Sequence, residues 1–103
     1  MKIGIDLGGT KTEAILIDNL GEEKFRKRIL TEKNYEGTLE GIISLVNEIE
    51  YNFKKVKSIG IGMPGIVSKY TSLVKNANSI WLNGKPLKKD LENIFNRKVN
   101  IEN

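Results

Sequence analysis

The 103-residue sequence contains no cysteine and no histidine, and it has only two prolines and one tryptophan. The absence of cysteine excludes disulfide bonds, zinc sites built on thiolates, and thiol nucleophiles. The absence of histidine removes the usual general base and the commonest metal ligand. Any catalysis by this chain must therefore rest on carboxylates, lysines, hydroxyl groups, or a cation held by oxygen atoms.

Long hydrophobic runs are also missing, since no segment approaches the roughly 18 apolar residues of a membrane span. The first six residues include the charged Lys2 and Asp6 and lack the apolar stretch of a secretory signal. The composition, 39% hydrophobic and 29% charged, is typical of one soluble globular domain covering residues 1–103. We therefore expect a cytoplasmic location and no membrane partner.

The net charge of +4 raises the question of nucleic-acid binding, but the basic residues are scattered along the chain. The densest cluster is Lys24, Arg26, Lys27 and Arg28, which lies in a predicted strand flanked by glutamates. Charges on a strand typically keep an edge solvated and resistant to aggregation. This interpretation predicts no nucleic-acid partner.

Hydrophobic patterning predicts an α/β fold with the element order β-β-β-α-β-α-β. Three strands are predicted at 2–6, 12–18 and 22–30, followed by an amphipathic helix at 35–53, a strand at 57–62, a helix at 86–96 and a strand around Val99 and Ile101. Such an order favours a mixed five-stranded sheet with helices against it. We expect the last strand to lie centrally and one sheet face there to remain uncovered.

The segment 63–86 is predicted to be mainly irregular, with a short strand near Leu73 and Val74. Loops of this length in compact domains are usually functional.

A carboxylate followed by a glycine turn, at Asp6 to Thr12, is the sharpest local motif. Glycines allow backbone N–H groups to converge on phosphate oxygens, and the hydroxyls of Thr10 and Thr12 add donors. Asp6 suits a magnesium ion, which prefers hard oxygen ligands. A plain hairpin turn with a surface aspartate is the alternative. The motif is not a Walker A loop, because Thr10 stands where a glycine must precede the lysine.

A second glycine motif, Gly60 to Gly65, matches the spacing of a dinucleotide-binding fingerprint after a predicted strand. That fingerprint also requires a helix to begin at the motif. Because Pro64 lies inside it and the following residues are not helical, we interpret it as a sharp turn that exposes backbone groups of Pro64 and Gly65 to a small ligand.

An amide-rich stretch at 74–84 is the third motif and includes Trp81. Asparagine offers both a donor and an acceptor, which suits sugar hydroxyls, and Asn78 is the candidate contact. Turn or capping roles are at least as plausible for Asn76 and Asn83. Trp81 is interpreted as a buried anchor of the loop rather than as a stacking platform for a sugar.

Together these motifs, in this order, resemble the ROK family of sugar kinases over essentially the whole chain. The run Ile3–Glu13 is similar to the family's phosphate motif, and 59–65 to its second glycine motif. The stretches 76–87 and 90–91 are closest to the fructokinase, mannokinase and N-acetylglucosamine kinase branch. The resemblance implies an actin-like, ribonuclease-H-like N-terminal lobe, with ATP in the cleft between it and a second lobe.

The resemblance also implies roles for individual residues. Asp6, Gly8, Gly9, Thr10, Lys11 and Thr12 would address the ATP phosphates and Mg²⁺, with Asp6 facing the metal. Pro64, Gly65, Asn78 and Asn103 would line the pocket for the hexose. The family's catalytic base is an aspartate expected directly after Asn103, so no catalytic residue is assigned here. The zinc segment with its cysteines and histidines is likewise expected beyond Asn103.

The expected function is therefore the N-terminal part of an ATP-dependent kinase that phosphorylates the 6-hydroxyl of fructose, mannose, glucose or N-acetylglucosamine. Phosphoryl transfer depends mainly on positioning and charge neutralisation. We expect the isolated chain to be inactive and the lobe to form homo-oligomers through its exposed face. A ROK-type sugar-responsive transcriptional regulator is the alternative, although its DNA-binding segment would have to precede Ile3. A non-catalytic sugar-binding module is a third possibility.

Overall fold

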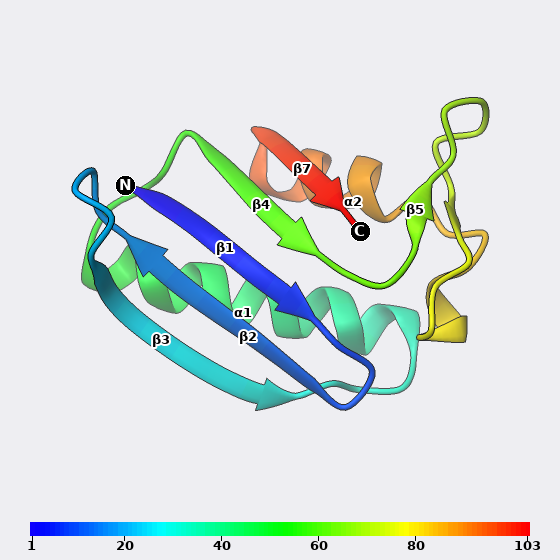
Figure 1. The fold of residues 1–103 in the computed structure, drawn as a ribbon, viewed down its shortest axis with the longest axis horizontal. Coiled ribbons are helices and arrows are strands. Elements are labelled where there is room, and N and C mark those ends of the chain that lie inside the picture. The colour runs from blue at the N-terminus through cyan, green and yellow to red at the C-terminus, as the bar shows by residue number, and fades with distance from the viewer.

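The computed structural model describes all residues from 1 to 103 and consists of two layers, a mixed five-stranded sheet and two helices behind it (Figure 1). The strands of the main sheet are β1 (Lys2–Leu7), β2 (Lys11–Ile17), β3 (Glu23–Leu30), β4 (Ser58–Gly62) and β7 (Lys98–Glu102). The helices are α1 (Tyr35–Asn52) and α2 (Leu87–Phe95). The predicted α/β class and the order of these seven elements are confirmed.

The sheet order is β3-β2-β1-β4-β7, so the chain begins as an antiparallel meander and continues with parallel crossovers. β1 pairs antiparallel with β2, whereas β4 runs parallel to both β1 and β7. The expectation of a central last strand is wrong, because α2 carries the chain past β4 and leaves β7 at the sheet edge. The antiparallel meander followed by parallel crossovers still matches the lobe expected from the resemblance to actin-like ATPases.

The core lies between the sheet and the helices because alternate strand residues point to the helix side. In β1 these residues are Ile3, Ile5 and Leu7, each 2–3% exposed. α1 buries Ile42, Leu45, Val46 and Ile49 against them, and the Asn34 side chain caps this helix by accepting from the N–H of Gly37. Phe53, predicted as the last residue of the apolar face, lies beyond the helix and is 40% exposed.

The segment between β4 and α2 has more order than the sequence indicates. It contains a small hairpin of β5 (Ile66–Val67) and β6 (Val74–Lys75), followed by the short 3-10 helix η1 (Ile80–Leu82). The predicted strand near Leu73 and Val74 corresponds to β6, but its partner β5 was not predicted. Two-residue strands carry too little periodicity to be recognised.

A buried ion pair joins the far end of α1 to the turn between α2 and β7. The guanidinium of Arg97 binds the carboxylate of Glu50, and these side chains are only 10% and 14% exposed. Burial would raise the pKa of Glu50, but Arg97 and the N–H of Val56 outweigh it and lower that pKa. The pair therefore fixes the end of the molecule opposite the glycine turn at residues 8–11.

None of the helices is long and apolar enough to cross a membrane.

Candidate functional site

The carboxyl ends of three parallel strands meet at one edge of the sheet, where α/β proteins usually bind ligands. Asp6 of β1 lies opposite Gly62 of β4, and Gly62 lies opposite Glu102 of β7. The N–H of Met63 donates to the carbonyl of Glu102 at 3.0 Å and continues the pairing past the strand ends. Asp6 and Asn103 consequently line the same groove, about 600 Å³ in volume, on the sheet face that the helices leave uncovered.

The glycine turn, residues 8–11, is built from its own backbone. The N–H of Gly8 donates to the carbonyl of Lys11 at 3.0 Å. A Cβ at Gly8 would lie 2.8 Å from that carbonyl oxygen, so the tight turn requires a glycine there. Gly9, Thr10 and Lys11 are exposed, and the side chains of Thr10 and Lys11 make no hydrogen bond or ion pair. The turn thus presents backbone, a hydroxyl and an ammonium group to the solvent.

The hydroxyl of Thr12 lies beneath the glycine turn. Thr12 is 3% exposed, and its Oγ1 lies 2.7 Å from Oγ1 of Thr31. Because Thr31 uses its proton to donate to the carbonyl of Gly8 at 2.9 Å, Thr12 is the donor of the pair. The N–H of Thr31 also donates to the carbonyl of Thr10. Thr12 and Thr31 therefore support the turn from below, and the Thr12 hydroxyl does not face the solvent.

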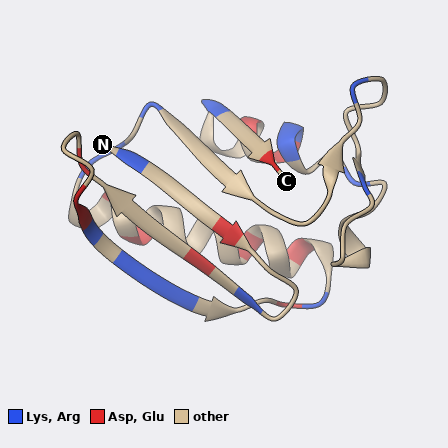
Figure 2. Cartoon of the chain, in the orientation of Figure 1, with Lys and Arg blue, Asp and Glu red and all other residues tan.

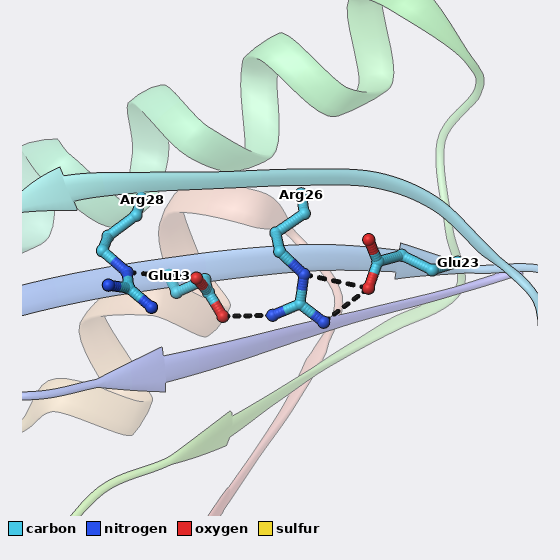
Figure 3. A network of polar contacts seen from close by, with 4 residues as sticks. All are labelled: Glu13, Glu23, Arg26 and Arg28. Atoms are coloured by element: carbon cyan, nitrogen blue, oxygen red, sulfur yellow. Dashed lines mark hydrogen bonds and ion pairs between the residues drawn. The ribbon is translucent and has the colours of Figure 1, made fainter.

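The carboxylate of Asp6 stands beside a paired charge network but takes no part in it. Glu13 of β2, which lies opposite Asp6, binds Arg26 and Arg28 of β3. Arg26 also binds Glu23 (Figure 3). The hydrogen bond from Arg26 lowers the pKa of Glu23. The basic cluster of β3 thus lies on a solvated strand, as predicted, and its side chains are paired with carboxylates.

The free carboxylate of Asp6 fits the needs of a magnesium ion bound through phosphates. No group of three or more acidic, histidine or cysteine side chains gathers anywhere in the chain. Magnesium in phosphate sites typically keeps several waters and takes one or two carboxylates together with phosphate oxygens. Asp6, exposed and without a hydrogen-bond partner next to the glycine turn, is the residue suited to that role.

On the other side of the site, the 63–86 segment folds back on itself at Gly65. This residue has a φ of +143°, and a Cβ there would lie 2.9 Å from Cα of Ala77. The N–H of Asn78 donates to the carbonyl of Pro64 at 3.3 Å. Pro64, Gly65 and Asn78 are therefore brought together, and the Asn78 side chain is exposed without a partner. The prediction that this turn exposes backbone groups of Pro64 and Gly65 is wrong, because the Pro64 carbonyl accepts from Asn78 and Gly65 is buried.

Two asparagines in this segment have structural roles. Asn76 adopts a left-handed backbone with a φ of 57°, and Oδ1 of Asn83 accepts from the N–H of Ala77 at 2.9 Å. Asn76 thus makes a turn, and Asn83 closes the loop that presents Asn78. These two positions match the structural alternative that the sequence left open.

Aromatic side chains anchor the same segment to the start of α1. Nε1 of Trp81 donates to Oγ1 of Thr38 at 3.0 Å, as expected for an anchor. The hydroxyl of Tyr35 donates to Oδ2 of Asp90 at 2.6 Å, and burial together with that carboxylate raises the pKa of Tyr35. Lys85 lies over the Tyr35 ring, with Nζ 5.6 Å from the centroid. The Trp81 and Lys85 contacts hold the segment against the start of α1, and the Tyr35–Asp90 bond joins α1 to α2.

The two halves of the site lie next to each other at Gly9 and Ser79, which are separated by 70 positions in the sequence. A Cβ on Gly9 would lie 3.5 Å from Oγ of Ser79, an ordinary van der Waals contact. Ser79 is buried and directly follows Asn78. The candidate phosphate residues and the candidate sugar residue Asn78 therefore belong to one continuous site.

Several residues that shape the site were not predicted from the sequence. Thr31, Thr38, Ser79 and the Tyr35–Asp90 pair act through contacts between distant segments. Glu13, Arg26 and Glu102 line the groove with Asp6 because alternate residues share a strand face. Only this last set had a local signal, since the alternation in β2, β3 and β7 is visible in the sequence.

The fold defines the class of protein. A ROK family glucokinase from Streptomyces griseus, solved with glucose and AMPPNP, superposes with a TM-score of 0.85 at 30% identity. The alignment covers 99% of this chain and 32% of that one. A ROK family transcriptional regulator also superposes, with a TM-score of 0.77 over 99% of this chain and 27% of its own, but its 20% identity shows a shared fold alone. The chain has the actin-like ATPase fold seen in ROK kinases.

The family follows from the sequence comparison. The profile of the ROK family matches residues 2–103. N-acetyl-D-glucosamine kinase from Haemophilus influenzae is 36% identical over 104 residues, an alignment that includes all of this chain and 34% of the kinase. The chain belongs to the ROK family, and it spans about a third of the length of the curated relatives it matches.

Proposed function

We propose that this chain is the N-terminal lobe of an ATP-dependent hexose kinase that phosphorylates the sugar 6-hydroxyl. The observation that carries the proposal is the proximity of Gly9 to Ser79, because it places an exposed glycine turn beside a loop that presents Asn78. A kinase must hold the donor phosphate and the acceptor hydroxyl next to each other. Sugar kinases among the relatives, acting on N-acetyl-D-glucosamine or bound to glucose, support the same conclusion.

On the donor side, backbone N–H groups of Gly8 and Gly9, with Thr10 and Lys11, would bind the ATP phosphates. Asp6 would hold Mg²⁺ directly or through water, and the ion would neutralise charge on the phosphates. Thr12 would act from beneath by keeping the turn in shape through Thr31.

On the acceptor side, Asn78 and Asn103 would exchange hydrogen bonds with sugar hydroxyls, and Pro64 and Gly65 would form the wall against which the sugar packs. The proton of the attacking hydroxyl would be taken by an aspartate following Asn103 in the full-length protein. Among fructose, mannose, glucose and N-acetylglucosamine, the last is the first substrate to test, because curated relatives phosphorylate it by name.

Two further parts of the proposal concern the whole protein. We propose a cytoplasmic enzyme that self-associates, supported by the sheet face that neither helix covers (Figure 1). Zinc, if the full-length protein holds it, would lie outside this lobe, which has no cysteine or histidine. Light scattering of the full-length protein tests self-association, and a mass equal to one chain would contradict it.

The activity is tested by ATP turnover of the full-length protein over a panel of hexoses. We expect turnover that depends on both a hexose and Mg²⁺, and a loss of about 100-fold in kcat for Asp6→Asn. Glu40→Gln, an exposed carboxylate of α1 without a partner, is the matched control and should leave turnover unchanged. The isolated chain should show none. If no hexose stimulates turnover, or Asp6→Asn behaves like the control, the kinase assignment is wrong.

A further inference from the structure

A second groove, about 820 Å³ in volume, lies between the β5–β6 hairpin and α2 and is lined by lysines from both sides. Lys69 and Lys75 come from the hairpin, and Lys88 and Lys89 come from the first turn of α2. Figure 2 shows basic positions at the hairpin and at the start of α2. We call this hollow, with its four lysines, the lysine groove. None of these four lysines is among the residues assigned to the proposed kinase site.

None of the four lysines in the groove has an ion-pair partner. By contrast, the clustered basic residues of β3 and Arg97 are all paired with carboxylates. The only carboxylate lining the groove belongs to Glu92, and its Oε2 already accepts from the N–H of Val99 at 3.1 Å. Like charges gathered around one hollow repel each other. An anion in the groove would relieve that repulsion.

The remaining polar groups of the groove are also donors. Oγ of Ser68 accepts from the N–H groups of Tyr70 and Thr71, at 3.2 and 3.3 Å, which leaves its own proton free to donate. Ser72 and the 97% exposed Tyr70 add two further hydroxyls. Ammonium groups and hydroxyls together suit phosphate oxygens, which accept several hydrogen bonds each.

We propose that the lysine groove binds a small anion carrying two or more phosphate groups. Four charges on opposite walls match several phosphates better than one. The lysines face a hollow rather than form a flat stripe along the surface, which favours a short oligophosphate over the backbone of a nucleic acid. Asn103 lines both this groove and the groove of Asp6, so the anion would lie next to the proposed sugar site without occupying the glycine turn. The binding itself does not depend on the proposed kinase activity.

Calorimetric titration of the full-length protein with inorganic tripolyphosphate tests this site. Lys88→Gln/Lys89→Gln and Lys69→Gln/Lys75→Gln should each weaken binding about tenfold or more. Lys54→Gln/Lys55→Gln removes the same charge from two exposed, unpaired lysines after α1 and should change affinity less than about twofold. Lys11→Gln, at the glycine turn, should leave this binding event in place.

Four results would overturn the proposal. Equal losses in the groove variants and in the Lys54/Lys55 control would mean that only net charge matters. Loss in Lys11→Gln, with the groove variants unaffected, would place the anion at the glycine turn. Tighter binding of a short DNA duplex that displaces tripolyphosphate would make the groove part of a nucleic-acid surface. If the full-length protein is a sugar kinase but does not bind tripolyphosphate, the groove proposal is wrong and the proposed function stands. If the groove binds tripolyphosphate but the protein has no kinase activity, the groove proposal stands and the proposed function is wrong.

Discussion

The glycine turn at 8–11 and the 63–86 segment are neighbours, yet they are held in place by different means. The turn joins two paired strands, and its shape comes from a backbone hydrogen bond between Gly8 and Lys11. The 63–86 segment has only two-residue strands, and side-chain contacts of Trp81 with Thr38 and of Lys85 with Tyr35 hold it against α1. The turn is thus shaped by its own backbone, and the 63–86 segment by side chains from elsewhere in the chain. Substitutions that remove side chains should therefore affect the second half more than the first.

The largest effect on stability is expected from Gly65→Ala. The added methyl would lie 2.9 Å from Cα of Ala77, and a φ of +143° is strained for any residue but glycine. Both effects together should lower the free energy of unfolding by about 3 kcal/mol. Gly84→Ala is the matched control, because its φ is +78° and nothing lies within 4 Å. It should cost about 1 kcal/mol in chemical denaturation of the full-length protein. Equal costs would show that the contact with Ala77 does not shape the segment.

Gly8→Ala should be the next most damaging change. Its Cβ would lie 2.8 Å from the carbonyl oxygen of Lys11, so the turn must open, at a cost of about 2 kcal/mol. Gly9→Ala meets only Oγ of Ser79 at 3.5 Å and should change stability by less than about 0.5 kcal/mol. The added methyl should nevertheless raise the KM for ATP, because it would lie between the glycine turn and Ser79. Steady-state kinetics with varied ATP check this, and an unchanged KM would separate Gly9 from the phosphates.

A smaller effect than that of Gly8→Ala is expected at the anchor of Trp81. Thr38→Val removes the hydroxyl that accepts from Nε1 of Trp81 and that also lies within donating distance of the carbonyls of Glu32 and Asn34, and it should cost about 1 kcal/mol, whereas Thr38→Ser keeps the hydroxyl. Because the anchor positions Asn78, Thr38→Val should raise the KM for the hexose and leave the KM for ATP unchanged. Combining it with Trp81→Phe should cost less than the sum of the two single changes. Additive costs, or equal rises in both KM values, would contradict the anchoring role.

The glycine turn was predictable from the sequence, and the support around it was not. Asp6, Gly8 and Lys11 lie within six residues of one another, so the local sequence alone indicates a carboxylate before a tight glycine turn. Thr31 closes that turn from beneath, but its place depends on the pairing of β3 with β2. Periodicity predicted α1 within one residue because its buried positions repeat over 18 residues.

In the 63–86 segment the sequence indicated the residue types but not their arrangement. Asn78 and Gly65 are adjacent only because the backbone at Gly65 turns toward Ala77, a long-range effect without a periodic signal. The edge position of β7 was mispredicted for a related reason, since sheet order depends on where α2 crosses rather than on the strand itself.

A crystal structure of the full-length protein with a non-hydrolysable ATP analogue and a hexose would show directly whether the glycine turn and Asn78 form one site. We expect phosphate oxygens within hydrogen-bond distance of the backbone nitrogens at Gly8 to Thr10, and a sugar hydroxyl bonded to the side chain of Asn78. A nucleotide bound away from the glycine turn, or a hexose without contact to Asn78, would contradict it.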